Sequence, residues 1–414
     1  GGAPSALWGC GLLAVSSFVS YLAASALRKH RRKSVLLAVV CYHIAVLGIF
    51  KYTGFFTGGA VQTPFVPLGI SFFTFQQIWY LREVYAGTFS QVPTPAEYLT
   101  YSFFFPTVSS GPILKPGNFF PQLRETSPLP QDTAAGLYAI GLGLAKKVLL
   151  ADAAGKVASQ ILDGSLASNT TVAAWLGILL YTFEIYFDFS GYSDMAIGLG
   201  RMLGFRFLEN FNYPFLADSI TDFWRRWHIS MGTWFRDYVY IPLGGNKGGL
   251  AKQLRNIAIV WLLTGFWHGA SWNFVLWGVY FGVLLVLEKL FLLRFLKKLP
   301  AVLRHIYALT LVTISWTLFA FTDIAKGLAW LTAMFSGTLF DSGSLYLLLT
   351  YGTMLAICAL AATPLGKRFY EKLNMRLGRR ALTVMDCGGL LCVLIASIAY
   401  LVSGSYNPFL YFRF

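Results

Sequence analysis

The sequence predicts an all-α polytopic membrane protein with about eleven helical segments, in which broken or re-entrant helices surround a central tunnel. Hydrophobic residues make up 56% of the 414 residues and charged residues only 12%, whereas soluble domains carry about 25% charge. The net charge of +15 comes from basic residues that lie in short clusters between apolar runs. This pattern is typical of membrane orientation rather than of nucleic-acid binding. The composition excludes disorder, collagen and coiled coil.

The first predicted span is Leu7–Leu27, an uncharged run that is long enough to cross a bilayer. It ends at the basic cluster Arg28–Lys33, which places this end in the cytoplasm because cytoplasmic loops carry an excess of Lys and Arg. Ser34–Phe50 then returns to the outer face. We expect residues 1–63 to form a group of N-terminal transmembrane helices.

The middle of the chain, residues 64–270, is expected to form a core of broken helices. Between Pro64 and about Tyr240, Pro, Gly and charged residues interrupt the apolar stretches at intervals too short for simple spans. Non-helical backbone at membrane depth is tolerated only where protein buries it or water lines it. We therefore expect broken, tilted or re-entrant helices around a cavity. One long helix begins at Thr171–Phe183 and continues through the acidic positions that follow.

Simple spans resume after this core. Asn256–Leu287 has no formally charged residue and predicts two helices joined by a turn near Gly269. Residues 271–414 are expected to form C-terminal transmembrane helices, and the three parts form one integral membrane domain. The later spans are predicted at Ile306–Thr322, Leu345–Thr363 and Ala381–Ser403. Ala325–Phe340 is expected to lie flat on the outer face, which keeps the basic belt Lys367–Arg380 in the cytoplasm.

The segment Thr221–Ser230 packs three charged residues and a histidine among tryptophans. A charged side chain at the centre of a spanning helix costs about 2.5 to 3.5 kcal/mol, so these charges pair, face a cavity or lie in the interface. One interpretation is an interfacial amphipathic helix that is anchored by Trp and Arg. The other is a basic lining for an anionic ligand, because the forks of Arg225 and Arg226 suit phosphate.

His268 is the sharpest candidate for chemistry, since it stands alone inside a long uncharged run. An imidazole titrates near neutrality and exchanges a proton at little cost, so histidines often act as general bases. The alternative is a buried histidine that is only hydrogen-bonded, which is the interpretation we prefer for His43. His30 and His305 belong to basic loops and are not assigned a role.

Carboxylates and lysines in the core offer a second set of candidates. Glu184 and Asp188 are four residues apart and share a helix face, and Asp194 follows. These carboxylates have two possible interpretations: an acid–base pair, or a structural network that holds a cavity. Nearby Tyr and Arg residues favour the network. Lys146 and Lys147 are interpreted either as interfacial side chains that extend their charge to water or as contacts for an anionic donor.

No metal site or permanently bound cofactor is predicted. The five cysteines contain no C-x-x-C pair and all lie in apolar runs, so they are predicted to be small buried hydrophobes. The sequence holds no G-x-S-x-G, P-loop or dinucleotide fingerprint. The glycine-rich stretch Leu243–Gly249 is interpreted as a flexible connector.

Three stretches carry a resemblance to a known family: Phe223–Ser230, Trp234–Gly245 and Gly265–Gly269. Supporting stretches follow in the same order along the chain: Pro67–Gln76, Gly111–Ile113, Phe120–Leu123, Lys146–Lys147, Phe187–Ala196, Glu209–Phe211 and Asn407–Phe412. Together they strongly resemble the membrane-bound O-acyltransferase family. Within this family they more specifically resemble the bacterial branch of alginate and peptidoglycan O-acetyltransferases. The teichoic-acid D-alanyl transfer protein is a more distant relative.

The resemblance implies a bacterial inner-membrane enzyme that moves an acyl group, here acetyl, from cytoplasmic acetyl-CoA to an extracytoplasmic polysaccharide or peptidoglycan. By position, His268 matches the family's catalytic histidine and His228 its second motif histidine. Residues 64–270 are then the acyltransferase core, in which Asn210 helps to hold the cavity open. The implied partners are an extracytoplasmic acceptor protein and membrane lipid. Relatives usually have another hydrophobic stretch before Leu7, so a further N-terminal helix is expected.

In this hypothesis His268 deprotonates an acceptor hydroxyl inside a water-poor tunnel, and basic residues hold the donor phosphates. D-alanyl transfer to teichoic acid is the alternative within the enzyme class. A transporter or flippase for a lipid-linked or acyl-carrying molecule is the alternative outside it, although transporter folds often show repeated halves and this sequence shows none. A scaffold subunit with a vestigial pocket is a further alternative. Cleavage of a thioester distinguishes the enzyme from the transporter and from the scaffold.

Overall fold

The structure is a computed structural model that describes residues 3–403 except 64, 90, 126–128 and 165–169, together with residue 409. Every regular element in these residues is helical, as the composition predicts. Eight helices are long and apolar enough to cross a membrane, and the chain is a multi-pass membrane protein. The described residues form nineteen α-helices, more than the predicted eleven segments, because several segments divide at short π-helical turns.

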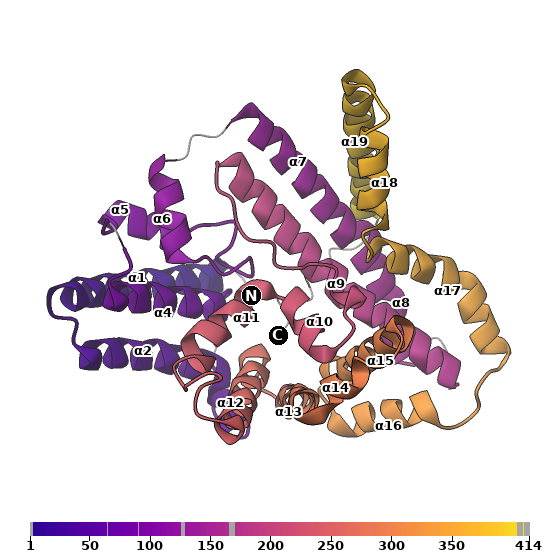
Figure 1. Ribbon diagram of the computed structural model, residues 1–414, viewed down its shortest axis with the longest axis horizontal. Helices are drawn as coiled ribbons and strands as arrows, with labels where there is room; N and C mark the ends of the chain where they lie inside the picture. The colour runs from indigo at the N-terminus through magenta and orange to yellow at the C-terminus, as the bar shows by residue number, and fades with distance from the viewer. Residues whose placement is uncertain are drawn as a thin grey trace. The chain divides into compact units, whose positions relative to one another are not determined.

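The chain folds into two compact units, and each unit combines segments that are separate in the sequence. The first unit holds residues 1–137, 196–209 and 230–243, and the second unit holds residues 138–195, 210–229 and 244–414. Figure 1 labels the helices in chain order. The predicted division at residues 63 and 270 stays a prediction.

The first unit begins with the predicted N-terminal spans. Its helices are α1 (Ala3–His30), α2 (Lys33–Leu47), α3 (Thr53–Phe56), α4 (Ile70–Ala86), α5 (Pro95–Ser102) and α6 (Pro116–Glu125). Helices α1, α2 and α4 pack against one another and lie side by side in Figure 1. Gly69 opens α4 with φ 73°, and a Cβ there would lie 2.4 Å from the Val108 carbonyl oxygen. Glycine is therefore required at this position.

A hydrogen-bonded polar network joins α1, α2, α4 and α5. His43 is fully buried, and its Nε2 lies 2.7 Å from Ser20 Oγ. The Gln77 amide donates to Ser17 Oγ at 3.3 Å and to Ser102 Oγ at 3.2 Å. Buried polar groups inside a membrane protein need such partners, so the structure places His43 in the packing of these helices.

The second unit contains most of the later helices. Those that lie in it are α8 (Asp152–Leu162), α10 (Ile220–Arg226), α12 (Leu250–His268), α13 (Trp272–Leu287), α14 (Leu293–Leu296), α15 (Ala301–Ala320), α16 (Ile324–Phe335), α17 (Ser342–Ala361), α18 (Leu365–Asn374) and α19 (Arg379–Ser403). Three helices contain residues of both units: α7 (Pro130–Ala145), α9 (Thr171–Met202) and α11 (Ile229–Phe235).

The uncharged run after residue 256 folds as predicted, into α12 and α13 joined by a turn at residues 269–271. Two glycines let these helices approach closely. A Cβ at Gly265 would lie 2.6 Å from the Phe274 carbonyl oxygen, and one at Gly278 would lie 2.4 Å from the Trp261 carbonyl oxygen. Close packing of small residues is a usual source of helix association in membranes.

The core differs from the prediction in one respect. Short helices such as α5, α6, α10 and α11 confirm that the region is interrupted. However, residues 130–162 also form a helix long and apolar enough to span, and the expected intervals too short for simple spans are wrong there. The span at residues 171–202 is the predicted long helix. Helix α9 continues through all three predicted acidic positions, and two of them, Asp188 and Asp194, are paired with neighbouring lysines.

The predicted burial of the cysteines is wrong for most of them. Cys358 is buried, but Cys10, Cys41, Cys387 and Cys392 are exposed. These four lie on α1, α2 and α19, which are long and apolar enough to span a membrane, so an apolar sequence context does not require burial in protein. Helix α16 has only twelve residues, and its placement flat on the outer face stays a prediction.

Candidate functional site

His228 lies between the short helices α10 and α11 and has a left-handed backbone with φ 46°. This conformation costs a non-glycine residue of order 1 to 3 kcal/mol and persists only where the surroundings enforce it. The side chain is fully buried. Its Nδ1 lies 3.3 Å from Asn210 Oδ1, and the next residue, Ile229, donates its N–H to the Asn210 carbonyl oxygen at 3.0 Å. Asn210 therefore fixes both the backbone and the ring of His228.

His268 ends helix α12 and is 6% exposed. Aromatic rings surround the imidazole. Its ring centroid lies 4.8 Å from that of Trp277, 4.9 Å from Trp267 and 5.5 Å from Phe319. An apolar wall of this kind lowers the local dielectric and strengthens any electrostatic interaction made inside it.

The structure brings the two predicted histidines together, although forty positions separate them in the sequence. The Trp267 ring lies 5.8 Å from His228 and 4.9 Å from His268. The rings of Trp227 and Trp277 both contact Trp316, at 5.3 and 6.1 Å. We call this group the histidine cluster: His228, His268, Trp227, Trp267, Trp277, Trp316 and Phe319. All of its members belong to the second unit.

Glu288 anchors helix α10, which leads into His228, and sequence reasoning missed it. The carboxylate is 1% exposed. Its oxygens accept the backbone N–H groups of Ile220 at 2.7 Å and of Thr221 at 2.8 Å, as well as the Tyr307 hydroxyl at 3.1 Å. A carboxylate at a helix N-terminus satisfies donors that the helix leaves open. One feature of the sequence could have identified Glu288: it is the first charged residue after the uncharged run Asn256–Leu287.

The two arginines of α10 differ in their surroundings. Arg226 Nε lies 2.9 Å from Asp222 Oδ2, one helical turn earlier. Arg225 is exposed. Part of the predicted basic lining is thus an ion pair within the helix, and Arg225 remains accessible to an anionic ligand.

The predicted acidic residues join the two lysines in what we call the paired-charge network. Lys147 Nζ lies 2.7 Å from Asp152 Oδ1 and 2.6 Å from Asp188 Oδ1. Lys146 Nζ lies 2.6 Å from Asp194 Oδ2. Glu184 lies against Gly155, where a Cβ would be 2.4 Å from the Glu184 carboxyl carbon. These contacts favour the structural interpretation of Glu184, Asp188 and Asp194.

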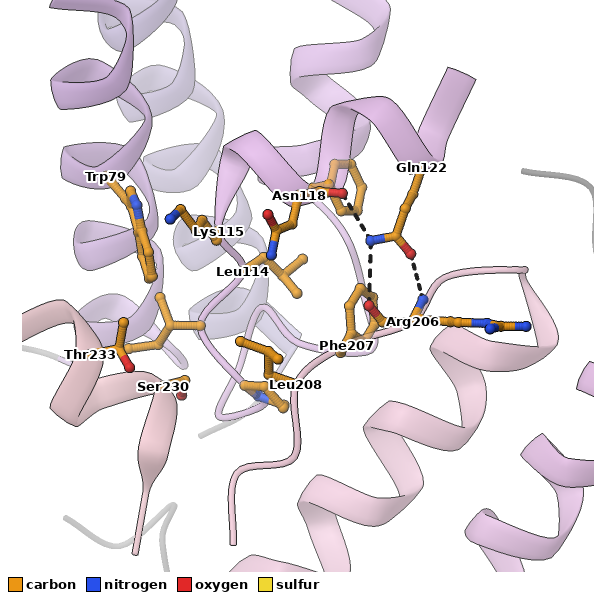
Figure 2. A pocket seen from close by; sticks show the side chains of 13 residues that line it. Trp79, Leu114, Lys115, Asn118, Gln122, Arg206, Phe207, Leu208, Ser230 and Thr233 are labelled. Carbon is orange, nitrogen blue, oxygen red and sulfur yellow. Dashed lines mark hydrogen bonds between the residues drawn. The ribbon is translucent and has the colours of Figure 1, made fainter. Parts of the chain in front are cut away.

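The first unit contains an open pocket, shown in Figure 2, that sequence reasoning also missed. It encloses about 520 Å³, including its open mouth. Trp79 forms one wall, and Lys115 and Asn118 bring polar groups to it. The Gln122 amide donates to the Asn118 and Arg206 carbonyl oxygens at 2.9 and 3.4 Å. Two of the supporting stretches meet here, since Pro112, Ile113 and Gln122 are all lining residues.

Helix α11 contributes Ser230 and Thr233 to this pocket. Ser230 follows His228 by two residues in the chain. Within the described ranges of the sequence, no group of three or more His, Cys, Asp or Glu side chains is arranged to hold a metal ion.

Comparison with known proteins gives one family. The model of the membrane-bound O-acyltransferase family matches residues 7–328. The chain is 38% identical over 345 residues to the "Probable alginate O-acetylase AlgI" of Azotobacter vinelandii. The aligned region covers 79% of this chain and 68% of that protein. The chain is also 34% identical over 421 residues to the protein of the same name from Pseudomonas putida, and this aligned region covers 94% of this chain and 86% of the relative.

A relative with a different polymer in its name is also similar. The chain is 32% identical over 344 residues to the "Peptidoglycan O-acetyltransferase" of Helicobacter pylori, covering 74% of this chain and 65% of that protein. The similarity therefore extends to proteins named for O-acetylation of two different polymers, alginate and peptidoglycan.

Proposed function

Because the chain belongs to the membrane-bound O-acyltransferase family, we propose that it transfers an acetyl group from cytoplasmic acetyl-CoA to an extracytoplasmic polysaccharide or peptidoglycan. The observation that carries this proposal is the meeting of His228 and His268 around Trp267 in a buried aromatic cluster. The names of the relatives supply the acetyl group and the kinds of polymer. The membrane is the bacterial inner membrane in this proposal, and a separate acceptor protein receives the acetyl group on the outer side.

His268 acts as the general base in the proposed reaction. Its imidazole accepts the proton of an acceptor hydroxyl while the hydroxyl oxygen attacks the carbonyl carbon of the thioester. The carbon–sulfur bond then breaks, and the imidazolium returns the proton to the CoA thiolate. Proton transfer by a positioned imidazole contributes about 10² to 10⁴-fold to the rate. His228, which Asn210 holds by its ring and backbone, positions the reacting groups.

The donor phosphates are assigned to helix α10. Arg225 is exposed, and guanidinium groups bind phosphate in bidentate fashion. Lys147 already lies between two carboxylates, and Lys146 pairs with Asp194. Arg226 is likewise paired, with Asp222. We therefore favour Arg225 over Arg226 and the two lysines as the donor contact. Arg225→Gln is expected to raise the KM for acetyl-CoA several-fold and to leave kcat within about twofold.

Reconstitution of the full chain with radiolabelled acetyl-CoA, the acceptor protein and a candidate polymer tests the proposal. Release of free CoA and labelling of the polymer support it. Movement of label without cleavage of the thioester would identify a transporter instead. Activity with a D-alanyl carrier protein and none with acetyl-CoA would replace acetyl by D-alanyl transfer.

A further inference from the structure

Helix α18 carries two chemically different faces that the proposed reaction does not use. Its apolar face is formed by residues at four-residue intervals: Leu365, Phe369 and Leu373. Its charged residues are Lys367, Arg368, Glu371 and Lys372. Arg368 and Lys372 border the apolar face, because they lie three and seven positions after Leu365. Phe369 is 68% exposed and Leu365 is 52% exposed. An exposed helix of this pattern is typical of segments that lie in a membrane interface.

The neighbouring helices keep α18 next to the ends of two candidate membrane spans. Helices α17 and α19 are both long and apolar enough to span, and only residues 362–364 and 375–378 connect them to α18. A connector of three residues reaches at most about 11 Å, so α18 stays close to the ends of both spans. The Tyr370 hydroxyl also donates to Asp386 Oδ2 of α19 at 3.0 Å, and Figure 1 shows the two helices next to each other.

The charge of this region is strongly one-sided. Glu371 is the one acidic residue between residues 365 and 380, and the basic residues there are Lys367, Arg368, Lys372, Arg376, Arg379 and Arg380. Such an excess of Lys and Arg beside spanning helices places the segment on the cytoplasmic side. Each Lys or Arg near an anionic leaflet contributes about 1 kcal/mol of attraction.

Helix α16 provides a contrast within the same unit. It is also short, but unlike α18 it is apolar along its length, and Lys326 is its one charged residue. A short helix between spanning helices therefore need not carry a basic face, and the charges of α18 need a separate explanation. An acidic soluble protein would match the charge, but it would leave the exposed Phe369 face without an apolar environment. A lipid surface satisfies both faces at once.

We propose that α18 is a docking helix for anionic phospholipids of the cytoplasmic leaflet. Phe369 and its neighbours enter the boundary between headgroups and acyl chains. Lys367, Arg368 and Lys372 bind the headgroup phosphates. This interaction is independent of the proposed acetyl transfer.

Lipid retention by the full chain tests the proposal. The protein is reconstituted in equal amounts of phosphatidylglycerol and phosphatidylcholine and extracted in mild detergent, and the retained lipids are quantified by mass spectrometry. Wild type is expected to retain phosphatidylglycerol at least threefold over phosphatidylcholine. A triple variant, Lys367→Gln, Arg368→Gln and Lys372→Gln, is expected to lose more than half of this preference.

Matched variants locate the effect. Neutralising three residues of the other basic cluster, Lys29→Gln, Arg32→Gln and Lys33→Gln, removes the same charge without touching an amphipathic helix. This control is expected to keep most of the preference. Equal lipid ratios for wild type and the α18 variant would overturn the proposal, as would an equal loss in the two variants.

Melting temperatures test whether the variants fold and whether the bound phosphate belongs to a lipid headgroup or to a free anion. Both variants are expected to keep the melting temperature of wild type in pure phosphatidylcholine. Addition of phosphatidylglycerol is expected to raise the melting temperature of wild type more than that of the α18 variant. If inorganic phosphate at the same concentration raised it equally, the ligand would be a free anion and the lipid proposal would be wrong.

Discussion

The second unit buries polar groups in two different ways. In the paired-charge network, Lys147 Nζ meets two carboxylates within 2.7 Å, so the cost of burying each charge is offset by its partners. In the histidine cluster, Trp and Phe rings cover His228 and His268. The network suits a structural role because its charges are mutually neutralised. The cluster suits proton transfer because a neutral imidazole enters an apolar wall at low cost and still exchanges a proton.

Removal of the cluster's central imidazole gives the largest expected effect. His268→Ala is expected to lower acetyl transfer about 10² to 10⁴-fold and to leave the melting temperature within a few degrees. Initial rates and thermal unfolding of the same preparation measure both. His43→Ala is the control, because His43 is equally buried but packs with Ser20. The His43→Ala variant is expected to lose stability and to keep its rate per folded molecule. Loss of rate in His43→Ala and loss of stability alone in His268→Ala would contradict the roles assigned to the two histidines.

Disruption of the paired-charge network is expected to act on stability. Lys147→Met leaves two buried carboxylates without their ammonium partner, which costs about 3 to 5 kcal/mol. Lys146→Met is the matched control, since its pair with Asp194 is about one-third exposed, with side chains at 29% and 34%, and exposed pairs contribute at most about 1 kcal/mol. Chemical unfolding in bilayers compares the two. A raised KM for acetyl-CoA with unchanged stability in Lys147→Met would instead make this lysine a donor contact.

A smaller effect is expected at the link between α13 and α10. Glu288→Gln leaves one of the two N–H groups at the start of α10 without an acceptor, which costs about 1 to 3 kcal/mol. Because α10 ends two residues before His228, kcat is expected to fall about tenfold. Tyr307→Phe removes a hydrogen bond to the same carboxylate and leaves α10 capped. Equal losses of kcat in the two variants would contradict a positioning role for Glu288.

The smallest effect concerns an accessible ion pair in the first unit. Arg124 Nε lies 2.6 Å from Glu97 Oε1, and this hydrogen-bonded pairing lowers the pKa of Glu97 to about 2. The carboxylate therefore contributes stability above its ordinary pKa of 4.5 and loses it as the pH falls towards 2. Both side chains are about one-fifth exposed, at 22% and 20%, so the contribution is about 1 kcal/mol. The unfolding free energies of wild type and Glu97→Gln are expected to differ by a margin that shrinks as the pH is lowered from 6 to 2, because the folded-state pKa is about 2. A constant difference over this range would contradict this pairing.

The spans were largely predictable because hydrophobicity and charge clusters are local properties of the sequence. The α12–α13 pair followed from an uncharged run and a glycine turn. The two site histidines were also identified from local motifs. Their contact through Trp267 required the tertiary fold, since periodicity within either segment says nothing about how the segments meet.

Other features depend on contacts between distant segments and could not be predicted. Glu288 caps a helix that begins 68 positions earlier. The pocket of the first unit combines Trp79 with Ser230 and Thr233. The burial of the cysteines was predicted wrongly for a different reason, because lipid and protein both accept apolar side chains and composition does not separate them.

The most direct test of the central claim, that His268 promotes transfer of an acetyl group across the membrane, uses sealed proteoliposomes. Radiolabelled acetyl-CoA is supplied outside, and the acceptor polymer, with its acceptor protein, is enclosed in the lumen. In vesicles whose donor side faces outwards, wild type is expected to label the enclosed polymer, and His268→Ala is expected to label it at least 10²-fold more slowly. Equal labelling by the two proteins would contradict the account.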